Sequence, residues 1–203
     1  MGWNMNSRGI KVDNSFLENK IALRIAHLPA GDLCVLDCFS GEGKIWREIK
    51  EREKMRDINV VSIEKKTIDR LVLQGDNRKL MGTLLLTGKF NIVDLDAYGS
   101  PFPQMEIMFD AIKKSGMRED AHVFFTFIQS FQGSLHKKML ELIGYAPSMI
   151  KKIPTLFARN GFDKFCGYLA LRGVRKITYR SYCKNVIRKF YGYFSIKSLD
   201  KMG

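Results

Sequence analysis

One stretch, FNIVDLDAYGSPFP at residues 90–103, constrains the fold of this chain more than any other. Its first four residues, 90–93, have the composition of a buried strand, and two carboxylates, Asp94 and Asp96, follow directly. A buried strand that ends on two carboxylates indicates a functional site, because open α/β sheets bind their ligands at the carboxyl ends of their strands. The stretch by itself is also compatible with an acidic turn that residues 99–101 close.

A second strand end of this kind lies earlier in the chain. An apolar run ends on Asp37, Phe39 follows, and a turn with Gly41 and Gly43 leads into a helical spacing. Glycines let a backbone approach a ligand closely, and the N-terminus of a helix offers unpaired N–H groups. The dinucleotide fingerprint GxGxxG is excluded because position 46 is Trp, and there is no P-loop sequence.

Strand and helix patterns alternate along most of the chain, which predicts an α/β fold. The second strand ends on Glu64, where an acid in a nucleoside site takes the ribose hydroxyls. A third strand leads to Asp76 and Asn77, although residues 65–70 are short for a crossover helix. After the first strand, which ends on Asp37, strands are expected at residues 59–64, 71–73, 90–95, 121–127, 177–182 and 187–196. The last two form a hairpin around residues 183–186.

The length of 203 residues predicts one domain at residues 15–203, with residues 1–14 as a flexible N-terminal arm. The net charge is +13, and residues 151–203 carry 13 Lys or Arg against two Asp. This concentration of positive charge favours a polyanionic partner, nucleic acid before a membrane surface.

The cysteines and the apolar runs indicate which sites and which cellular compartment to expect. The four cysteines lack metal-ligand spacing, so we expect no metal site. There is no run of 18 apolar residues and no apolar signal core at the N-terminus, which predicts a cytoplasmic protein without membrane contact. The oligomeric state is left open.

The alternation and the closing hairpin, over residues 15–198, resemble the seven-stranded, Rossmann-like fold of class I methyltransferases, which use S-adenosylmethionine. This fold is a mostly parallel sheet with helices on both faces and a C-terminal antiparallel hairpin. Residues 90–103 resemble the D-x-D-P-[FY]-G-[ST]-P segment of the tRNA guanine-26 N2-dimethyltransferase family, and they are related to the [DN]-P-P-[YF] motif of base amino-methyltransferases. The chain departs from both at Ala97, where those families have Pro.

The resemblance implies a role for each matched residue. On the cofactor side it assigns Asp37, Phe39, Gly41 and Gly43 to the methionine part, Glu64 to the ribose, Asp76 and Asn77 to the adenine, and Asp94 to the closure of the site. On the acceptor side it assigns Asp96 and the Ala97 carbonyl to the target amine and Tyr98 to stacking on the base.

The implied activity is methyl transfer from S-adenosylmethionine, with S-adenosylhomocysteine as the product. The acceptor would be an exocyclic base amine of RNA, with guanine N2 of tRNA as the leading candidate. Two alternatives stay open: an amino-methyltransferase acting on DNA adenine or cytosine, and a nucleic-acid-binding protein that keeps the scaffold without turnover.

Overall fold

The computed structural model describes residues 16–65, 72–115, 120–130, 135–152, 160–184 and 187–197. The strands are β1 (Leu33–Asp37), β2 (Ile58–Glu64), β3 (Val72–Gln74), β4 (Ile92–Leu95), β5 (Asp120–Ser130), β6 (Thr178–Lys184) and β7 (Ile187–Lys197). The helices are α1 (Leu17–Ile25), α2 (Lys44–Arg52), α3 (Asn77–Leu85), α4 (Phe102–Ser115), α5 (Lys137–Leu142), α6 (Pro147–Lys152) and α7 (Gly161–Leu171).

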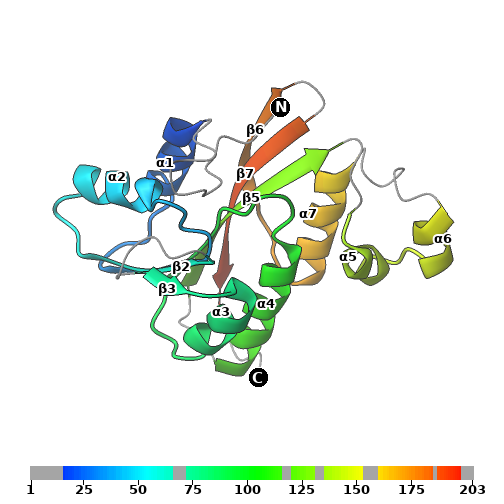
Figure 1. Ribbon diagram of the computed structural model, residues 1–203, viewed down its shortest axis with the longest axis horizontal. Coiled ribbons are helices and arrows are strands. Elements are labelled where there is room, and N and C mark those ends of the chain that lie inside the picture. Colours follow the sequence, from blue (N-terminus) through cyan, green and yellow to red (C-terminus); the bar gives the residue numbers. More distant parts are fainter. Residues whose placement is uncertain are drawn as a thin grey trace.

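All seven strands belong to one sheet, in the order β3-β2-β1-β4-β5-β7-β6 (Figure 1). The first five strands are parallel, and β7 is antiparallel to both β5 and β6. This arrangement is the seven-stranded class I methyltransferase fold, and it confirms the fold that the sequence predicts. Because β1 and β4 are neighbours in the middle of the sheet, the two strand ends with carboxylates, near Asp37 and Asp94, come side by side.

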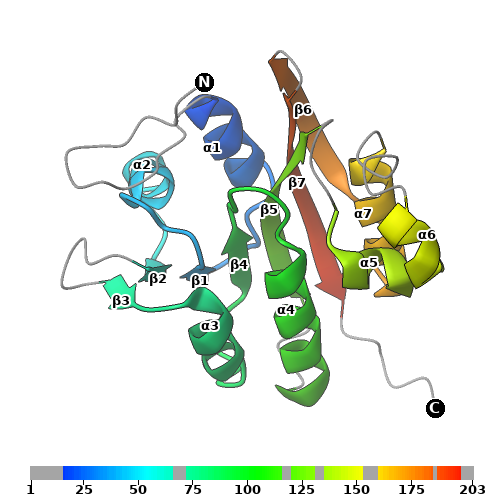
Figure 2. The same cartoon turned by 45° about the vertical axis from the view of Figure 1, so that its right-hand side comes forward.

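Helices cover both faces of the sheet (Figure 2). On one face α1 and α2 bury Ile21 and Trp46 against Val35 of β1. On the other face α3, α4 and α7 enclose the larger core, which includes Leu36 of β1. Successive side chains of a strand point to opposite faces, so a central strand such as β1 is apolar almost throughout.

The third strand forms despite its short connection to the second. Val72 pairs with Ser62 and Gln74 with Glu64, in parallel register. The structure describes the connection only at Lys65, so residues 66–70 of the expected short crossover, and residue 71 of the expected strand, lie outside the described residues.

The closing hairpin is longer than the sequence predicts. Cys183 and Lys184, which were expected in the turn, lie in β6 and pair with β7. The neighbouring strand β5 is also longer than expected, because Ser130 still pairs with Ile187 of β7. Gly192 of β7 lies opposite Phe125. The ring of Phe125 fills the space beside Gly192, so a Cβ added to Gly192 would lie only 2.1 Å from Phe125 Cζ.

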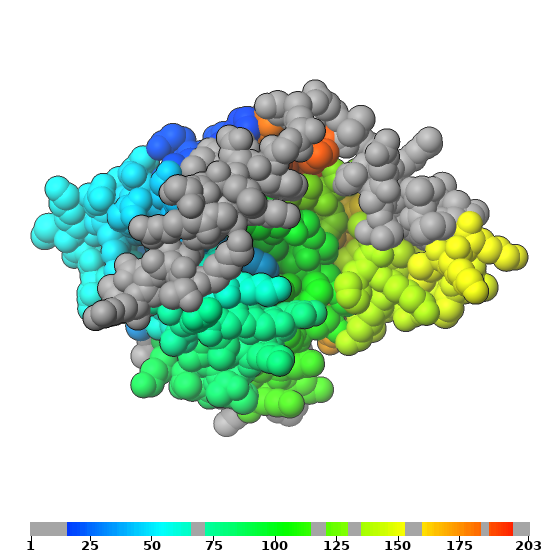
Figure 3. All heavy atoms as spheres, viewed as in Figure 1, coloured from blue at the N-terminus to red at the C-terminus, as the bar shows by residue number. Residues whose placement is uncertain are grey.

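Helices α5 and α6 form a small lobe that projects beside the sheet, at the right of the space-filling view (Figure 3). Its own apolar cluster contains Leu140 and Ile150. Of the helices that the structure describes, none combines the length and the apolar character that a membrane span needs. The predicted arm at residues 1–14 lies outside the described residues.

Candidate functional site

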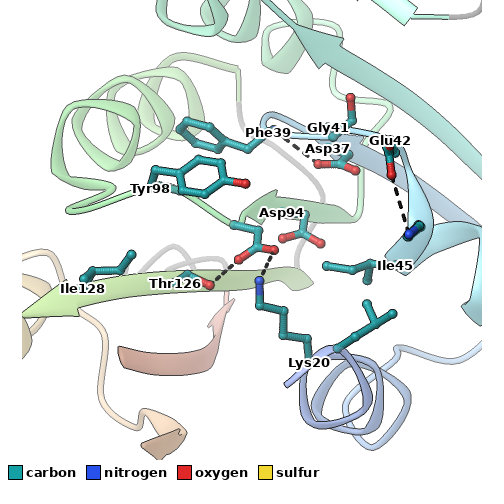
Figure 4. Close-up of a pocket in the computed structure, with 15 residues that line it drawn as sticks. Lys20, Asp37, Phe39, Gly41, Glu42, Ile45, Asp94, Tyr98, Thr126 and Ile128 are labelled. Atoms are coloured by element: carbon teal, nitrogen blue, oxygen red, sulfur yellow. Dashed lines mark hydrogen bonds and ion pairs between the residues drawn. The ribbon is translucent and has the colours of Figure 1, made fainter. Parts of the chain in front are cut away.

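A pocket lies at the carboxyl ends of β1, β4 and β5, where α1 closes it from one side (Figure 4). It brings together the two strand ends that the sequence singles out, although 57 residues separate Asp37 from Asp94 in the chain. The predicted site residues that line it are Asp37, Phe39, Gly41, Asp94, Asp96, Ala97 and Tyr98. Residues that the sequence analysis did not assign complete the wall, among them Leu17, Lys20, Ser40, Glu42, Lys44, Ile45, Thr126 and Ile128.

The turn after β1 forms the first wall of the pocket. Gly41 and Gly43 adopt φ angles of 52° and 65°, which are costly for residues with a Cβ, and the Gly43 N–H donates to the Ser40 carbonyl at 2.7 Å. Asp37 is buried, and its carboxylate accepts the Phe39 N–H at 3.2 Å. Burial first, and then the negative charge of Asp94, raise the pKa of Asp37 well above its usual value.

Asp94 is held by two side chains from the α1–α2 face. Arg24 of α1 donates to both carboxylate oxygens at 2.7 Å, and the Trp46 indole N–H of α2 donates to Oδ2 at 2.8 Å. Asp94 and Arg24 are almost fully buried. A buried ion pair of this geometry fixes the β4 end against the two helices, so Asp94 acts first as an anchor of the site.

Asp96 carries a different pair of hydrogen bonds. Lys20 of α1 donates to Oδ2 at 2.8 Å, and the Thr126 hydroxyl of β5 donates to Oδ1 (Figure 4). Burial alone would raise the pKa of Asp96, but the charges of Lys20 and Arg24 outweigh it and hold the pKa below its usual value. Asp96 is therefore a charged carboxylate at neutral pH, and its pKa is shifted in the direction opposite to that of Asp37 close by.

The spacing of these four charged residues matches between helix and strand. Lys20 and Arg24 are four residues apart, which is a rise of about 6.0 Å along a helix. Asp94 and Asp96 are two residues apart, which is about 6.6 Å along an extended chain. Each cation of one helix face thus meets one carboxylate, Lys20 with Asp96 and Arg24 with Asp94.

Lys20 and Arg24 are not among the residues that the sequence patterns predicted for the site, although the sequence contains a signal for them. The two cations occupy the same helical stripe as Leu17 and Ile21, which is the apolar face of α1. A cation on an apolar stripe needs a buried partner, since an unpaired buried charge is costly. Two such cations indicate two buried carboxylates, and the end of β4 supplies them.

Ala97, Tyr98 and Gly99 form the turn that follows Asp96. Ala97 is buried, while the Tyr98 side chain is 43% exposed at the pocket wall. Gly99 adopts a φ of 112°, and its carbonyl accepts the Ile128 N–H of β5 at 2.8 Å. Figure 4 shows the Tyr98 and Phe39 rings on the same side of the pocket, where they present apolar surface.

Four predicted cofactor residues do not line this pocket. The Glu64 carboxylate accepts the Gly41 N–H at 3.1 Å, and Asn77 donates to the Cys38 carbonyl at 2.8 Å. Asp76 caps α3 by accepting the Arg78 N–H at 2.9 Å. The Arg78 guanidinium bond first, and this backbone bond second, lower the pKa of Asp76. Glu64 and Asn77 thus contact the turn that follows β1, through Gly41 and Cys38, and Gly43 is the fourth predicted residue outside the lining.

Comparisons with known proteins add little to this geometry. No family model matches the chain, and no curated protein matches it either. Among solved structures, yhhF, a candidate methyltransferase from Escherichia coli, has a TM-score of 0.47 and 13% identity, with 92% of this chain and 89% of that chain covered. A candidate methyltransferase from Pseudomonas syringae has a TM-score of 0.47 and 12% identity, covering 89% and 99% of the two chains.

A third structure, a candidate exported protein from Bordetella parapertussis, has a TM-score of 0.49 and 8% identity, covering 90% of this chain and 67% of that chain. At such scores and identities the similarity indicates nothing about chemistry. The fold of this chain is defined by its own strand order and strand directions.

Proposed function

We propose that this protein transfers a methyl group from S-adenosylmethionine to an exocyclic amine of an RNA base, with tRNA as the leading substrate. One observation carries the proposal: residues assigned to the cofactor side and residues assigned to the acceptor side line a single pocket. They come from β1 and β4, which are adjacent strands. Ligands of open α/β sheets bind at such strand ends.

The residues present fit this cofactor by the chemistry of their donor groups. S-adenosylmethionine supplies an electrophilic methyl group on a sulfonium, and buried carboxylates such as Asp37 suit a cationic ligand. The Gly41 N–H donates to Glu64, so the acid that we assign to the ribose lies next to the glycine turn. We assign Asp37, Phe39 and Gly41 to the methionine part, Glu64 to the ribose, and Asp76 and Asn77 to the adenine.

Asp96 would hold the acceptor amine. An exocyclic base amine is a poor nucleophile because its lone pair is delocalised into the ring. Hydrogen bonds from the amine to Asp96 and to the Ala97 carbonyl would favour the pyramidal nitrogen that attack on a methyl group needs, which is catalysis by positioning and electrostatics. Tyr98 would stack on the base, an interaction worth about 1–3 kcal/mol. The proton can leave after the transfer.

The distribution of charge supports an RNA substrate. The described residues from 135 to 197 hold 13 Lys or Arg against Glu141 and Asp163, whereas the earlier described residues hold 14 against 15 acids. Tyr179 of β6 is 51% exposed, and Arg175, Lys176 and Arg180, near it in sequence, are exposed as well. Cations and an exposed aromatic ring together suit phosphates and bases of a single strand. Phe190 and Tyr191, by contrast, are core residues.

The test combines cofactor binding with methyl transfer. S-adenosylmethionine is titrated into the protein by calorimetry, and transfer of a tritiated methyl group is then measured onto bulk tRNA, total RNA and genomic DNA. We expect binding, with transfer to tRNA. Transfer to DNA alone would move the substrate class to DNA amines. A protein that binds RNA but no S-adenosylmethionine would be a binding protein on this scaffold, and the proposed activity would be wrong.

A further inference from the structure

Lys20 has a place in the pocket that the proposed chemistry does not yet use. It is 5% exposed, its ammonium lies 2.8 Å from Asp96 Oδ2, and it stands over the Tyr191 ring at 5.2 Å from the centroid. A buried ammonium in contact with both a carboxylate and a ring face is held in one position. Lys20 therefore contacts the carboxylate assigned to the acceptor amine directly.

Three carboxylates, Asp37, Asp94 and Asp96, lie at the strand ends beside two cations of α1, Lys20 and Arg24. The groups that face Asp96 from the surrounding elements are Lys20 and Arg24 from α1, Asp94 from β4, Asp37 from β1 and Thr126 from β5. Arg24 is committed to Asp94 through both oxygens. Among these groups, Lys20 is therefore the cation that donates a hydrogen bond to Asp96.

We infer that Lys20 is a positioning residue of the acceptor site, which keeps Asp96 charged and fixes the plane of its carboxylate for the incoming amine. The role in methyl transfer rests on the proposed function, whereas the charge of Asp96 does not. A charged Asp96 accepts hydrogen bonds from an amine, but a protonated Asp96 would donate one to the nitrogen lone pair that must attack. Thr126 holds the other oxygen, so the two contacts define the orientation together.

The charge of Asp96 is measured directly by carbon NMR titration of its carboxyl group in the cofactor-free protein, with the signal assigned through Asp96→Asn. In the wild type we expect Asp96 to titrate below the usual aspartate range. Lys20→Arg should keep this behaviour, and Lys20→Met should raise the pKa of Asp96. Arg52→Met is the matched control, because Arg52 of α2 also pairs with a carboxylate, that of Glu18 on α1, but on the exposed surface. Its Asp96 titration should equal that of the wild type.

The same variants are then compared in methyl transfer. Lys20→Met should lower kcat about a hundredfold, the scale of a misplaced reacting group, and move the acid limb of the pH profile to higher pH. Its affinity for S-adenosylmethionine should stay within about twofold, and Lys20→Arg should restore part of kcat. A Lys20→Met protein with the wild-type Asp96 titration, or with wild-type kcat, overturns the inference.

Two controls keep the outcome decisive. If Lys20→Met does not fold, as circular dichroism would show, the wild-type titration decides: an Asp96 that titrates above the usual range overturns the inference. A wild type that binds no S-adenosylmethionine refutes the proposed function instead. The NMR titration still decides whether Lys20 keeps Asp96 charged, so the two failures are distinguishable.

Discussion

Arg24 and Asp94 form a two-point ion pair across 70 residues of sequence, with both N–O distances at 2.7 Å and with side chains only 2% and 1% exposed. The pair joins α1 to the end of β4. Trp46 completes it from α2, so three elements meet at one carboxylate. The walls of the candidate site depend on this contact, because Asp96 follows Asp94 by two residues.

We expect Arg24→Met to lower the free energy of unfolding by about 3–5 kcal/mol, because it leaves Asp94 as a buried carboxylate without its cation. Urea denaturation at pH 7 measures the change. Arg52→Met removes a cation from an exposed pair, so its effect on the free energy of unfolding should be much smaller. Equal losses in the two variants would mean that the Arg24 pair is not an anchor.

Asp37→Asn should make the protein more stable at pH 7. Burial and the neighbouring Asp94 raise the pKa of Asp37 in the folded state, so the wild type loses stability as the pH rises from the usual aspartate range through the raised value. Asn cannot ionise, and its side-chain oxygen can still accept the Phe39 N–H. The gain should vanish near about pH 3, where the carboxyl is protonated in both states.

Unfolding by urea at a series of pH values gives this comparison. Asp110→Asn serves as the control, because Asp110 is an exposed carboxylate on α4. If Asp37→Asn were less stable than the wild type at pH 7, the direction stated here for the pKa of Asp37 would be wrong.

Asp96→Asn should separate methyl transfer from cofactor binding. We expect transfer to fall at least about a hundredfold, since the carboxylate that would hold the amine is gone, while the affinity for S-adenosylmethionine stays nearly unchanged. Glu64→Ala should instead weaken the binding of S-adenosylmethionine. Calorimetry and tritiated transfer measure both quantities. Persistent activity in Asp96→Asn would refute the assignment of the acceptor site.

RNA binding should fall steeply with salt, and the C-terminal cations should carry that dependence. Each phosphate contact removed lowers the slope of log K against log salt by about one. The double variant of Arg175→Ala and Arg180→Ala should therefore show a shallower slope, whereas Lys113→Ala with Lys114→Ala, at the end of α4, should not. Equal slopes in both double variants would remove the argument from charge.

Sequence patterns predicted the strand ends well because each one is a local feature. An apolar run that stops at Asp37 or Asp94 is visible without knowledge of any partner. The ion pairs of the pocket could not be placed so easily, because Lys20 and Asp96 are 76 residues apart and their contact depends on how α1 lies on the sheet. The apolar stripe of α1 indicated that its cations needed partners, but not which ones.

Strand lengths failed for a similar reason. Residues 121–127 were the expected fifth strand from their β-branched and aromatic side chains, but β5 continues to Ser130. Its end is set by pairing with Ile187, 57 residues later in the chain. Local propensity determines where such a strand can begin, while its partner determines how far it extends.

Gly192 gives a stability test that does not depend on function. A Cβ at this position would lie 2.1 Å from the Phe125 ring, and Phe125 is itself packed against Phe165 and Phe194. The ring has no free space to move into, so Gly192→Ala should lower the free energy of unfolding by about 1–3 kcal/mol or more. Gly167→Ala is the matched control, because Gly167 lies in α7 with nothing within 4 Å of its added Cβ.

In that control we expect a gain of about 0.5–1 kcal/mol, since Ala has the better helix propensity and restricts the unfolded chain. Thermal unfolding of the two variants beside the wild type measures the expected loss and the expected gain of stability in one experiment. A Gly192→Ala protein as stable as the wild type would show that Phe125 and β7 can separate. The close approach of β5 and β7 at the centre of the antiparallel pair would then not be a fixed feature of the fold.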